Sequence, residues 1–191
     1  MILASGSPQR RAILEQLGVA FRVVVSGVEE VEEGIAEEVA VENARRKARA
    51  VSAVREGPGA GRSPEPVLGV DTVVSLDRRL YGKPADPAAA AATLRALSGR
   101  THRVVSGVCV LDGGGERTAA AVTEVHFRAL DEPAVAWYVR TDEWRDRAGG
   151  YAIQGRGAAL VESIRGDYLN VVGLPVATLL NLLPALLFSV F

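Results

Sequence analysis

The stretch "PVLGVDTVVSLDRRLYGKP" (residues 66–84) predicts the centre of a β-sheet. Residues 66–76 are almost continuously apolar, which is typical of a strand covered on both faces. Asp77 and Arg78 then favour a tight connection, and residues 79–84 predict the antiparallel return strand. A hairpin at the centre of the sheet is therefore expected.

One carboxylate, Asp71, interrupts this apolar strand. A buried carboxylate is costly unless it is paired, metal-bound or at an accessible site, and the alternative is a strand position that faces solvent. If Leu76 pairs with Arg79 across the turn, Lys83 falls opposite Thr72, beside Asp71. This register brings a carboxylate and an ammonium group to the same edge of the sheet.

The stretch "MILASGSPQRRAILEQLG" (residues 1–18) predicts a short buried strand followed by a helix. Ser7 is a good N-cap, Pro8 suits the first helical position, and Gly18 ends the apolar stripe of the helix. The strand and the helix are thus joined by a tight loop.

Arg10 and Arg11 lie in the first turn of this helix, where acidic side chains are normally preferred. If both arginines point into water, the misfit costs only a few tenths of a kcal/mol. Alternatively, free N–H groups, the hydroxyls of Ser5 and Ser7 and the guanidinium groups form a cradle for an anion. The sequence contains no Walker motif, so this cradle is not a P-loop.

A longer helix is expected from about residue 37 to 54, with Glu42 placed to pair with Arg46. One face of this helix is formed, at helical spacing, by Ala40, Ala44, Lys47, Ala48 and Val51. Lys47 therefore projects from the side that should be buried. The alternative is a lysine at the helix edge whose ammonium group reaches water.

The remaining pattern alternates strands with helices. Strands are expected at 21–27, 102–113, 121–130 and 160–164, helices at 86–99, 131–141 and from residue 175, a mobile surface loop at 56–66 and a turn at 165–170. Hairpins mixed with helical crossovers indicate an α/β or α+β fold around one mixed sheet. We expect a single domain spanning residues 1–191.

Composition narrows the classes of function. With 24% charged residues and a net charge of -1, the chain has no basic character that would favour nucleic acid as a partner. The single Cys109 cannot form an internal disulfide, which favours the cytoplasm. Residues 171–191 carry no charge, but the prolines and polar residues inside this run favour a buried terminal helix over a membrane span.

The chemistry indicated is that of phosphates and a hard metal ion. His102, His126 and Cys109 lack the spacing of zinc ligands, and both histidines lie in strand patterns that suggest structural or surface roles. A carboxylate such as Asp71 can hold a divalent metal or activate water, while several cations hold a triphosphate. Magnesium or manganese suits this set of side chains.

The sequence resembles the Maf-type nucleoside triphosphate pyrophosphatases. The resemblance is carried, in order along the chain, by "LASGSPQRRAIL", "ENARRKA", "LGVDTVV", "GKPAD", "LSGRTHRVVSGV", "RAGGYAIQGRGA" and "GDYLNVVGLP". It implies an elongated α/β fold with a cleft between two lobes, related to the inosine triphosphate pyrophosphatases. It also implies cleavage between the α and β phosphates, giving monophosphate and pyrophosphate, with Mg²⁺ or Mn²⁺ as cofactor.

The resemblance also assigns roles to individual residues. The proton acceptor, which is also the expected metal ligand, falls on Asp71. The phosphate-binding residues fall on Ser7, Arg10, Lys47 and Lys83, and the residues linked to the choice of base fall on Arg10, Thr72 and Gln154. The stretch "GGYAIQG" is similar to the branch that acts on dTTP and UTP, rather than to the branch that acts on 7-methyl-GTP.

Two departures from the family pattern stand out. Many relatives have "SPRR" where this chain has "SPQRR", so Gln9 replaces the first arginine and Arg11 supplies a second one, displaced by one position. On a helix that shift rotates the side chain by about 100°, which puts in question whether Arg11 substitutes for the missing group. The apolar tail 184–191 is unexplained by the motifs, and we expect it to dock against the body or against a second copy in a homodimer.

The function expected from these features is hydrolysis of dTTP and UTP, a house-cleaning activity on the nucleotide pool. The alternative is a regulator of septum formation that binds nucleotides in the same cleft without hydrolysing them. Both predict nucleotide binding, and only the enzyme predicts release of pyrophosphate that depends on metal and on Asp71.

Overall fold

The computed structural model describes residues 1–55 and 65–187. The strands are β1 (Ile2–Leu3), β2 (Arg22–Val23), β3 (Val67–Leu76), β4 (Arg79–Tyr81), β5 (Thr101–Asp112), β6 (Gly115–Phe127) and β7 (Val161–Arg165). The α-helices are α1 (Pro8–Gln16), α2 (Ala36–Arg55), α3 (Pro87–Leu97), α4 (Glu132–Val139), α5 (Tyr168–Val172) and α6 (Val176–Leu182). Short 3₁₀ turns occupy Ala148–Gly150, Arg156–Leu160 and Pro184–Leu186. Most of the loop predicted at 56–66 lies outside the described residues.

A mixed sheet organises the molecule, as predicted. The strand order is β2-β1-β3-β5-β6-β7, with β4 paired to β3 beside this path. One edge of β3 is covered by β5 from Val67 to Ser75. The other edge pairs in parallel with β1 at Val67 and Leu68, and with β4 from Val74 to Leu76. Between those two partners, β3 lacks a ladder partner on that edge among the described strands.

The hairpin between β3 and β4 has the predicted register at its turn. Leu76 pairs with Arg79, and Asp77 and Arg78 both have positive φ angles, of 50° and 66°. Positive φ at both central residues is the mark of a type I′ turn, which matches the twist of a hairpin.

The predicted position of Lys83 on the ladder is wrong. β4 ends at Tyr81, so Lys83 lies beyond the strand and does not pair with Thr72, which faces Ser106 on β5 instead. The carbonyl of Gly82 instead accepts a hydrogen bond from the N–H of Gly149 at 3.1 Å, so the chain after β4 pairs with the segment at Gly149 and does not continue the ladder with β3.

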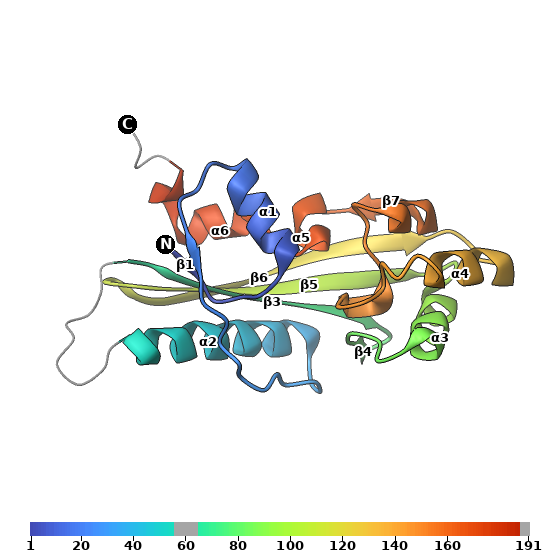
Figure 1. The fold of residues 1–191 in the computed structure, drawn as a ribbon, viewed down its shortest axis with the longest axis horizontal. Coiled ribbons are helices and arrows are strands. Elements are labelled where there is room, and N and C mark those ends of the chain that lie inside the picture. Colours follow the sequence, from blue (N-terminus) through green and yellow to red (C-terminus); the bar gives the residue numbers. More distant parts are fainter. Residues whose placement is uncertain (56–64, 188–191) are drawn as a thin grey trace.

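Helix α2 lies directly against the face of β3 and β5, while α1, α5 and α6 cover the opposite face (Figure 1). Two glycines allow this close approach. A Cβ atom on Gly69 would lie 2.1 Å from the backbone oxygen of Ala44, and one on Gly107 would lie 2.2 Å from that of Ala40. The predicted alanine face of α2 is therefore confirmed as the contact surface with the sheet.

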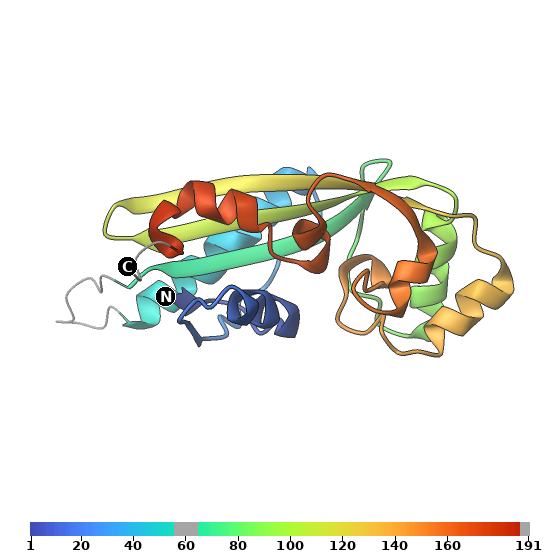
Figure 2. The same ribbon diagram turned by 90° about the horizontal axis from the view of Figure 1, so that it is seen from above.

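The two largest apolar cores lie at the two ends of the sheet (Figure 2). One packs α1 and α6 against the sheet, with Leu14 and Leu179 fully buried. The other joins α3, α4 and the segment after α4, with Tyr138 and Trp144 at its centre. These cores define two lobes on one elongated sheet, as expected.

Two predicted elements differ from the structure. The strand expected at 21–27 is reduced to Arg22–Val23. The turn expected at 165–170 contains the start of α5, because the side chain of Asp167 accepts a hydrogen bond from the N–H of Leu169 at 2.8 Å and caps the helix.

The apolar C-terminal run is broken into short pieces. α6 begins after Pro175 and ends at Leu182, before Pro184, and Leu174 and Leu179 are fully buried against the body. Within the described parts of the chain, none of the helices has the length and apolarity needed to cross a membrane. Leu186 of the predicted tail packs against the apolar cluster of Leu174 and Leu179, as expected for docking against the body, and residues 188–191 lie outside the described part of the chain.

Candidate active site

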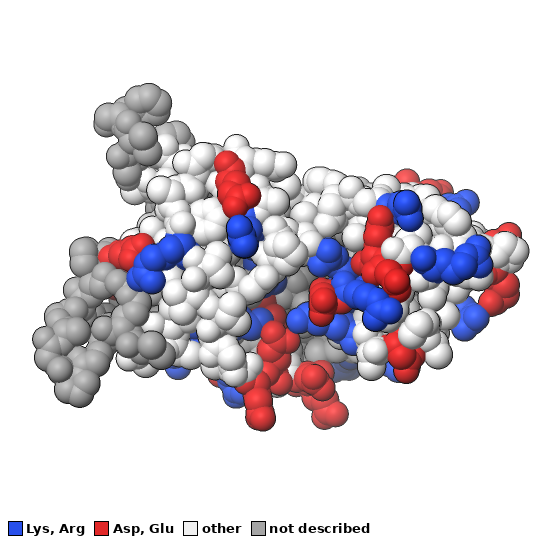
Figure 3. All heavy atoms as spheres, in the orientation of Figure 1, with Lys and Arg blue, Asp and Glu red and all other residues white. Residues whose placement is uncertain are grey.

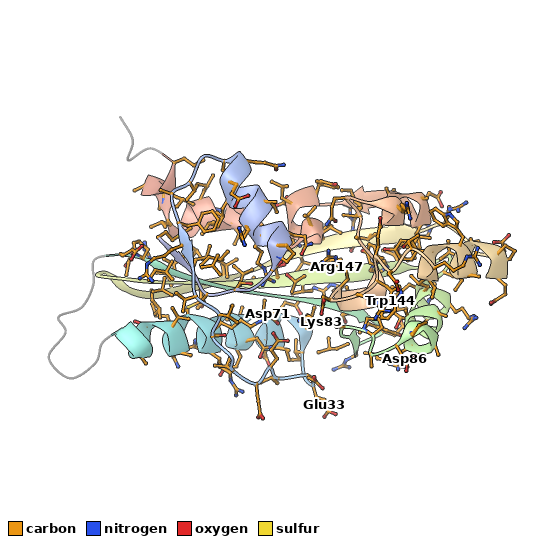
Figure 4. The ribbon with its side chains drawn as sticks, viewed as in Figure 1. Glu33, Asp71, Lys83, Asp86, Trp144 and Arg147 are labelled. Atoms are coloured by element: carbon orange, nitrogen blue, oxygen red, sulfur yellow. The ribbon has the colours of Figure 1, made fainter. Side chains whose placement is uncertain are left out.

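A cleft of about 880 Å³ lies between the two lobes. The structure brings all of the predicted site residues to its walls: Ser7, Arg10, Lys47, Asp71, Thr72, Lys83 and Gln154. Lys and Arg side chains gather near the middle of the face in Figure 3, with acidic side chains below them. Figure 4 labels Asp71 beside Lys83, where the two lobes meet.

Asp71 lies on the part of β3 that β1 and β4 leave open. Its residue is 5% exposed, so the alternative of a strand position facing solvent is wrong. Its Oδ1 accepts a hydrogen bond from Lys47 Nζ at 2.6 Å, and its Oδ2 accepts one from Asn43 Nδ2 at 3.1 Å. Each oxygen of this buried carboxylate thus has one hydrogen-bond partner within the protein.

The pKa of Asp71 is set by opposing effects. Burial alone raises it, but the positive charges of Lys47 and Arg10 and the hydrogen bonds from Lys47 and Asn43 outweigh burial and lower the pKa below its usual range. Asp71 is therefore ionised at neutral pH. An ionised carboxylate can orient a water molecule or ligate a cation.

Lys47 reaches this carboxylate from α2, and the residue is 8% exposed. Its Nζ also lies 2.5 Å from Glu30 Oε1, so one ammonium group is shared between two carboxylates. The alternative of a lysine that reaches into water is wrong. The glycines under α2 explain the geometry, since they bring this helix close enough for Lys47 to meet Asp71.

Arg10 is buried, whereas Arg11 is exposed. The guanidinium of Arg10 donates to the carbonyl of Gly173 at 2.9 Å, to Ser5 Oγ at 2.8 Å and to Thr72 Oγ1 at 3.1 Å. Burial lowers the pKa of Arg10, and the nearby charge of Asp71 opposes that change. Arg10 thus connects α1, β3 and the segment before α6 at the cleft.

The other predicted residues surround this centre. Ser7 caps α1 by accepting a hydrogen bond from the N–H of Arg10 at 3.5 Å. Thr72 Oγ1 lies 2.8 Å from Ser106 Oγ. Lys83 is exposed on the segment after β4. Gln154 is exposed on the lobe that contains α3 and α4, which we call the far lobe. Their roles in binding stay predictions.

Two site residues were missed by the sequence analysis. Asn43 stands one helical turn before Lys47, on the same face, and this spacing was the signal that could have found it. Asn43 Oδ1 also accepts from the N–H of Val31 at 2.7 Å, and its Nδ2 donates to the carbonyl of Val31 at 3.0 Å. The segment at Val31 is thereby tied to α2. This brings the neighbouring Glu30, the second missed residue, to Lys47, and nothing in the sequence of that segment indicates this contact.

The residues present fit a hard divalent cation that is shared with a substrate. In the described parts of the chain, no cluster of three or more histidine, cysteine, aspartate or glutamate side chains could hold a metal alone. Mg²⁺ is commonly held by one or two carboxylates together with substrate phosphates and water. Asp71 and Glu30, which both meet Lys47 Nζ, supply such carboxylates at the cleft.

Comparison with known proteins gives a consistent result. A family model described as "Maf-like protein" matches residues 1–186. The chain is 50% identical over 184 residues to a dTTP/UTP pyrophosphatase of Deinococcus radiodurans, covering 96% of this chain and 91% of that protein. Identity is 49% to a protein of that name from Thermococcus gammatolerans, covering 92% and 90% of the two chains. It is 42% to one from Pyrococcus furiosus, covering 96% and 93%.

Proposed function

The chain belongs to the Maf family, and from this membership and the geometry of the cleft we propose that it hydrolyses dTTP and UTP to the monophosphate and pyrophosphate. The names of its relatives support the substrates. The observation that carries the proposal is the buried, ionised Asp71 at the open edge of β3, paired with Lys47 and lying near Arg10. A carboxylate beside two cations suits attack on a phosphate.

We propose that Asp71 orients a water molecule for in-line attack on the α-phosphorus. In-line displacement at phosphorus depends mainly on the positioning of the reacting groups and on the stabilisation of charge, so a strong base is not required. A carboxylate with a lowered pKa meets this requirement, because it stays ionised and can accept a hydrogen bond from water. The cations Arg10, Lys47 and Lys83 would offset the negative charge of the pyrophosphate leaving group.

A divalent cation, Mg²⁺ or Mn²⁺, would be held by Asp71 and Glu30 together with the phosphates, and when bound it would neutralise charge on the phosphate oxygens. In the structure, Lys47 Nζ bridges these same two carboxylates. The ammonium group therefore holds both carboxylates on the cleft wall before substrate arrives.

The choice of base is assigned in this proposal to Gln154 and Thr72. An amide such as that of Gln154 can both donate to and accept from the edge of a pyrimidine. Gln154 lies on the lobe opposite Arg10 and Lys47, with the cleft between them. This arrangement leaves the base of the nucleotide on the side of the cleft that carries Gln154 and the phosphates on the side that carries Arg10 and Lys47. In this proposal residues 1–191 act as a single domain.

The proposal is tested by measuring pyrophosphate and monophosphate release from dTTP, UTP, CTP, the purine triphosphates and 7-methyl-GTP, with Mg²⁺ or Mn²⁺. We expect turnover of dTTP and UTP that is lost on chelation of the metal and reduced at least about 100-fold in Asp71→Asn. Binding of dTTP should change much less than turnover in this variant.

Asp112→Asn is a matched control, because Asp112 lies at the end of β5 and does not line the cleft. Its turnover should equal that of the unaltered protein. Nucleotide binding without release of pyrophosphate from any substrate would contradict the proposal.

A further inference from the structure

The predicted phosphate-binding cations are not equally available. Lys47 is engaged by two carboxylates, and Arg10 by three oxygen atoms of the protein. A triphosphate carries several negative charges, so it also requires cations that no carboxylate already neutralises. Among residues 1–55 and 65–187, three cations on the cleft wall form no ion pair with a described carboxylate: Arg10, Lys83 and Arg147. Because the guanidinium of Arg10 already donates to three oxygen atoms of the protein, Lys83 and Arg147 are the two that remain available.

Arg147 belongs to the far lobe but reaches across the cleft to α1. Its Nη1 donates a hydrogen bond to Gln9 Oε1 at 2.8 Å, although 138 residues separate them. Gln9 Oε1 also accepts a hydrogen bond from Ser7 Oγ at 3.1 Å. The guanidinium of Arg147 thus lies at the first turn of α1, beside the loop where phosphates are expected.

The side chain of Arg147 also has a hydrogen-bond donor without a partner. Arg147 Nε is buried and forms no hydrogen bond in the structure. Buried N–H groups of folded proteins are almost always paired, so a buried donor on a cleft wall indicates that an acceptor is supplied from outside the chain. The oxygen atoms of a phosphate are such acceptors, and an arginine fork suits them.

The backbone around Arg147 is fixed against the segment that carries Lys83. Gly149 and Gly150 have φ angles of 69° and 67°, and a Cβ atom on Gly150 would lie 3.0 Å from Pro84 Cγ. Figure 4 shows Arg147 and Lys83 close together in projection, at the junction of the two lobes. The backbone that carries Arg147 is therefore in direct contact with the segment that carries Lys83.

Neighbouring Arg145 differs from Arg147, although it also lines the cleft. Its guanidinium lies 4.5 Å from the ring centroid of Trp144, and its Nε is 3.1 Å from Asp142 Oδ1. Its charge is already matched by a carboxylate, so the geometry distinguishes Arg147 from it.

We infer that Arg147 is a further substrate-binding residue, which contacts the β and γ phosphates from the lobe opposite Lys47, and that Gln9 is its positioning residue. This inference rests on the proposed function, because it assigns part of the triphosphate to Arg147. It also explains the departure at position 9, since an arginine there would face another guanidinium, whereas the amide oxygen of Gln9 accepts its hydrogen bond.

The test compares the affinity of the protein for pyrophosphate and for dTMP, together with kcat and KM for dTTP. Arg147→Ala should weaken pyrophosphate binding about tenfold or more and raise KM, while dTMP binding stays unchanged. Arg147→Lys should restore only part of the affinity, because an ammonium group lacks the planar fork. Arg11→Ala is the control, since Arg11 is an exposed arginine near the start of α1, close to Gln9 in the sequence, and does not line the cleft.

Gln9→Ala tests the positioning role without removing a charge. It should weaken pyrophosphate binding about threefold in the unaltered protein and have no effect in the Arg147→Ala background. A merely structural role would instead change dTMP and pyrophosphate binding alike, and equal losses would overturn the inference.

The inference and the proposed function fail separately. If the unaltered protein hydrolyses dTTP and Arg147→Ala binds pyrophosphate normally, the inference alone is overturned. If pyrophosphate binding depends on Arg147 but no triphosphate is hydrolysed, the proposed function is overturned and the assignment of Arg147 to a phosphate stands.

Discussion

Lys47 Nζ lies 2.6 Å from Asp71 Oδ1, and this contact joins α2 to the open edge of β3. Each partner has a different fate when the other is removed. Without Asp71, Lys47 keeps its ion pair with Glu30 at 2.5 Å. Without Lys47, Asp71 stays buried with a single hydrogen bond, from Asn43. The pair is therefore energetically asymmetric.

We expect Lys47→Met to lower the free energy of unfolding by about 3–5 kcal/mol, because it leaves a buried carboxylate without its ion-pair partner. Asp71→Asn should lower it by clearly less. Urea denaturation at neutral pH measures both. If both variants lose the same free energy of unfolding, the prediction is wrong, because the ion pair with Glu30 then does not stabilise Lys47 when Asp71 is replaced.

Gly107 is expected to be essential for the seating of α2. In Gly107→Ala, the new Cβ atom would lie 2.2 Å from backbone atoms of Ala40, and the helix cannot yield as a flexible side chain would. We expect a loss of about 3 kcal/mol in the free energy of unfolding, with a further loss of activity as Lys47 moves. Gly113→Ala is the control, since a Cβ atom there meets nothing within 4 Å. A stable, active Gly107→Ala would contradict this packing.

His102 makes stability depend on pH. Burial, with a smaller effect of nearby His126, lowers the pKa of His102 to about 4 from its ordinary value of 6.5. Burial makes protonation of His102 harder in the folded state than in the unfolded state. The free energy of unfolding is therefore full above the pKa that His102 has in the unfolded state, and it falls as pH drops from there towards the pKa of His102 in the folded state. Between about pH 7 and pH 5 the free energy of unfolding should fall by about 2 kcal/mol from this residue.

The variant His102→Gln removes this titration while leaving a group that can hydrogen-bond Tyr151, whose Oη lies 2.8 Å from His102 Nε2. Urea denaturation at several pH values should give a flatter curve for the variant than for the unaltered protein. Two parallel curves would show that His102 does not control the change.

Glu143 is expected to hold the loop that carries Gln154. Its carboxylate accepts hydrogen bonds from the N–H groups of Arg156 at 3.1 Å and Gly157 at 3.2 Å. Glu143→Ala should lower kcat/KM for dTTP about tenfold and reduce the preference over CTP, because the amide of Gln154 is no longer oriented. Glu162→Ala, at an exposed glutamate of β7, should leave both unchanged. An unaltered preference in Glu143→Ala would remove Glu143 from this role.

Local signals determined several elements without the aid of structure. Ser7 with Pro8 begins α1 where predicted, and Asp86 with Pro87 begins α3. These signals succeed because a cap or a first-turn proline acts within a few residues. The register of the β3–β4 hairpin at Leu76 was predictable for the same reason, since the turn fixes it.

Other features needed contacts between distant segments. The position of Lys83 depended on the hydrogen bond between Gly82 and Gly149, which no local pattern reveals. Glu30 reaches Lys47 because the side chain of Asn43 ties the segment at Val31 to α2, and no local pattern predicts this contact. The sequence marked Lys47 as an odd charge on a buried face, and only the fold showed which carboxylates it meets.

The sequence by itself determined the order of elements, the mixed sheet and the set of charged residues that suit a triphosphate. Periodicity and capping encode these properties, because they depend on neighbours along the chain. The tertiary structure decided how the charges are paired: Lys47 with Asp71 and Glu30, and Arg147 with Gln9. Partners far apart in the chain meet only where the sheet and its two cores bring them together, so the availability of each cation for a phosphate is a property of the fold.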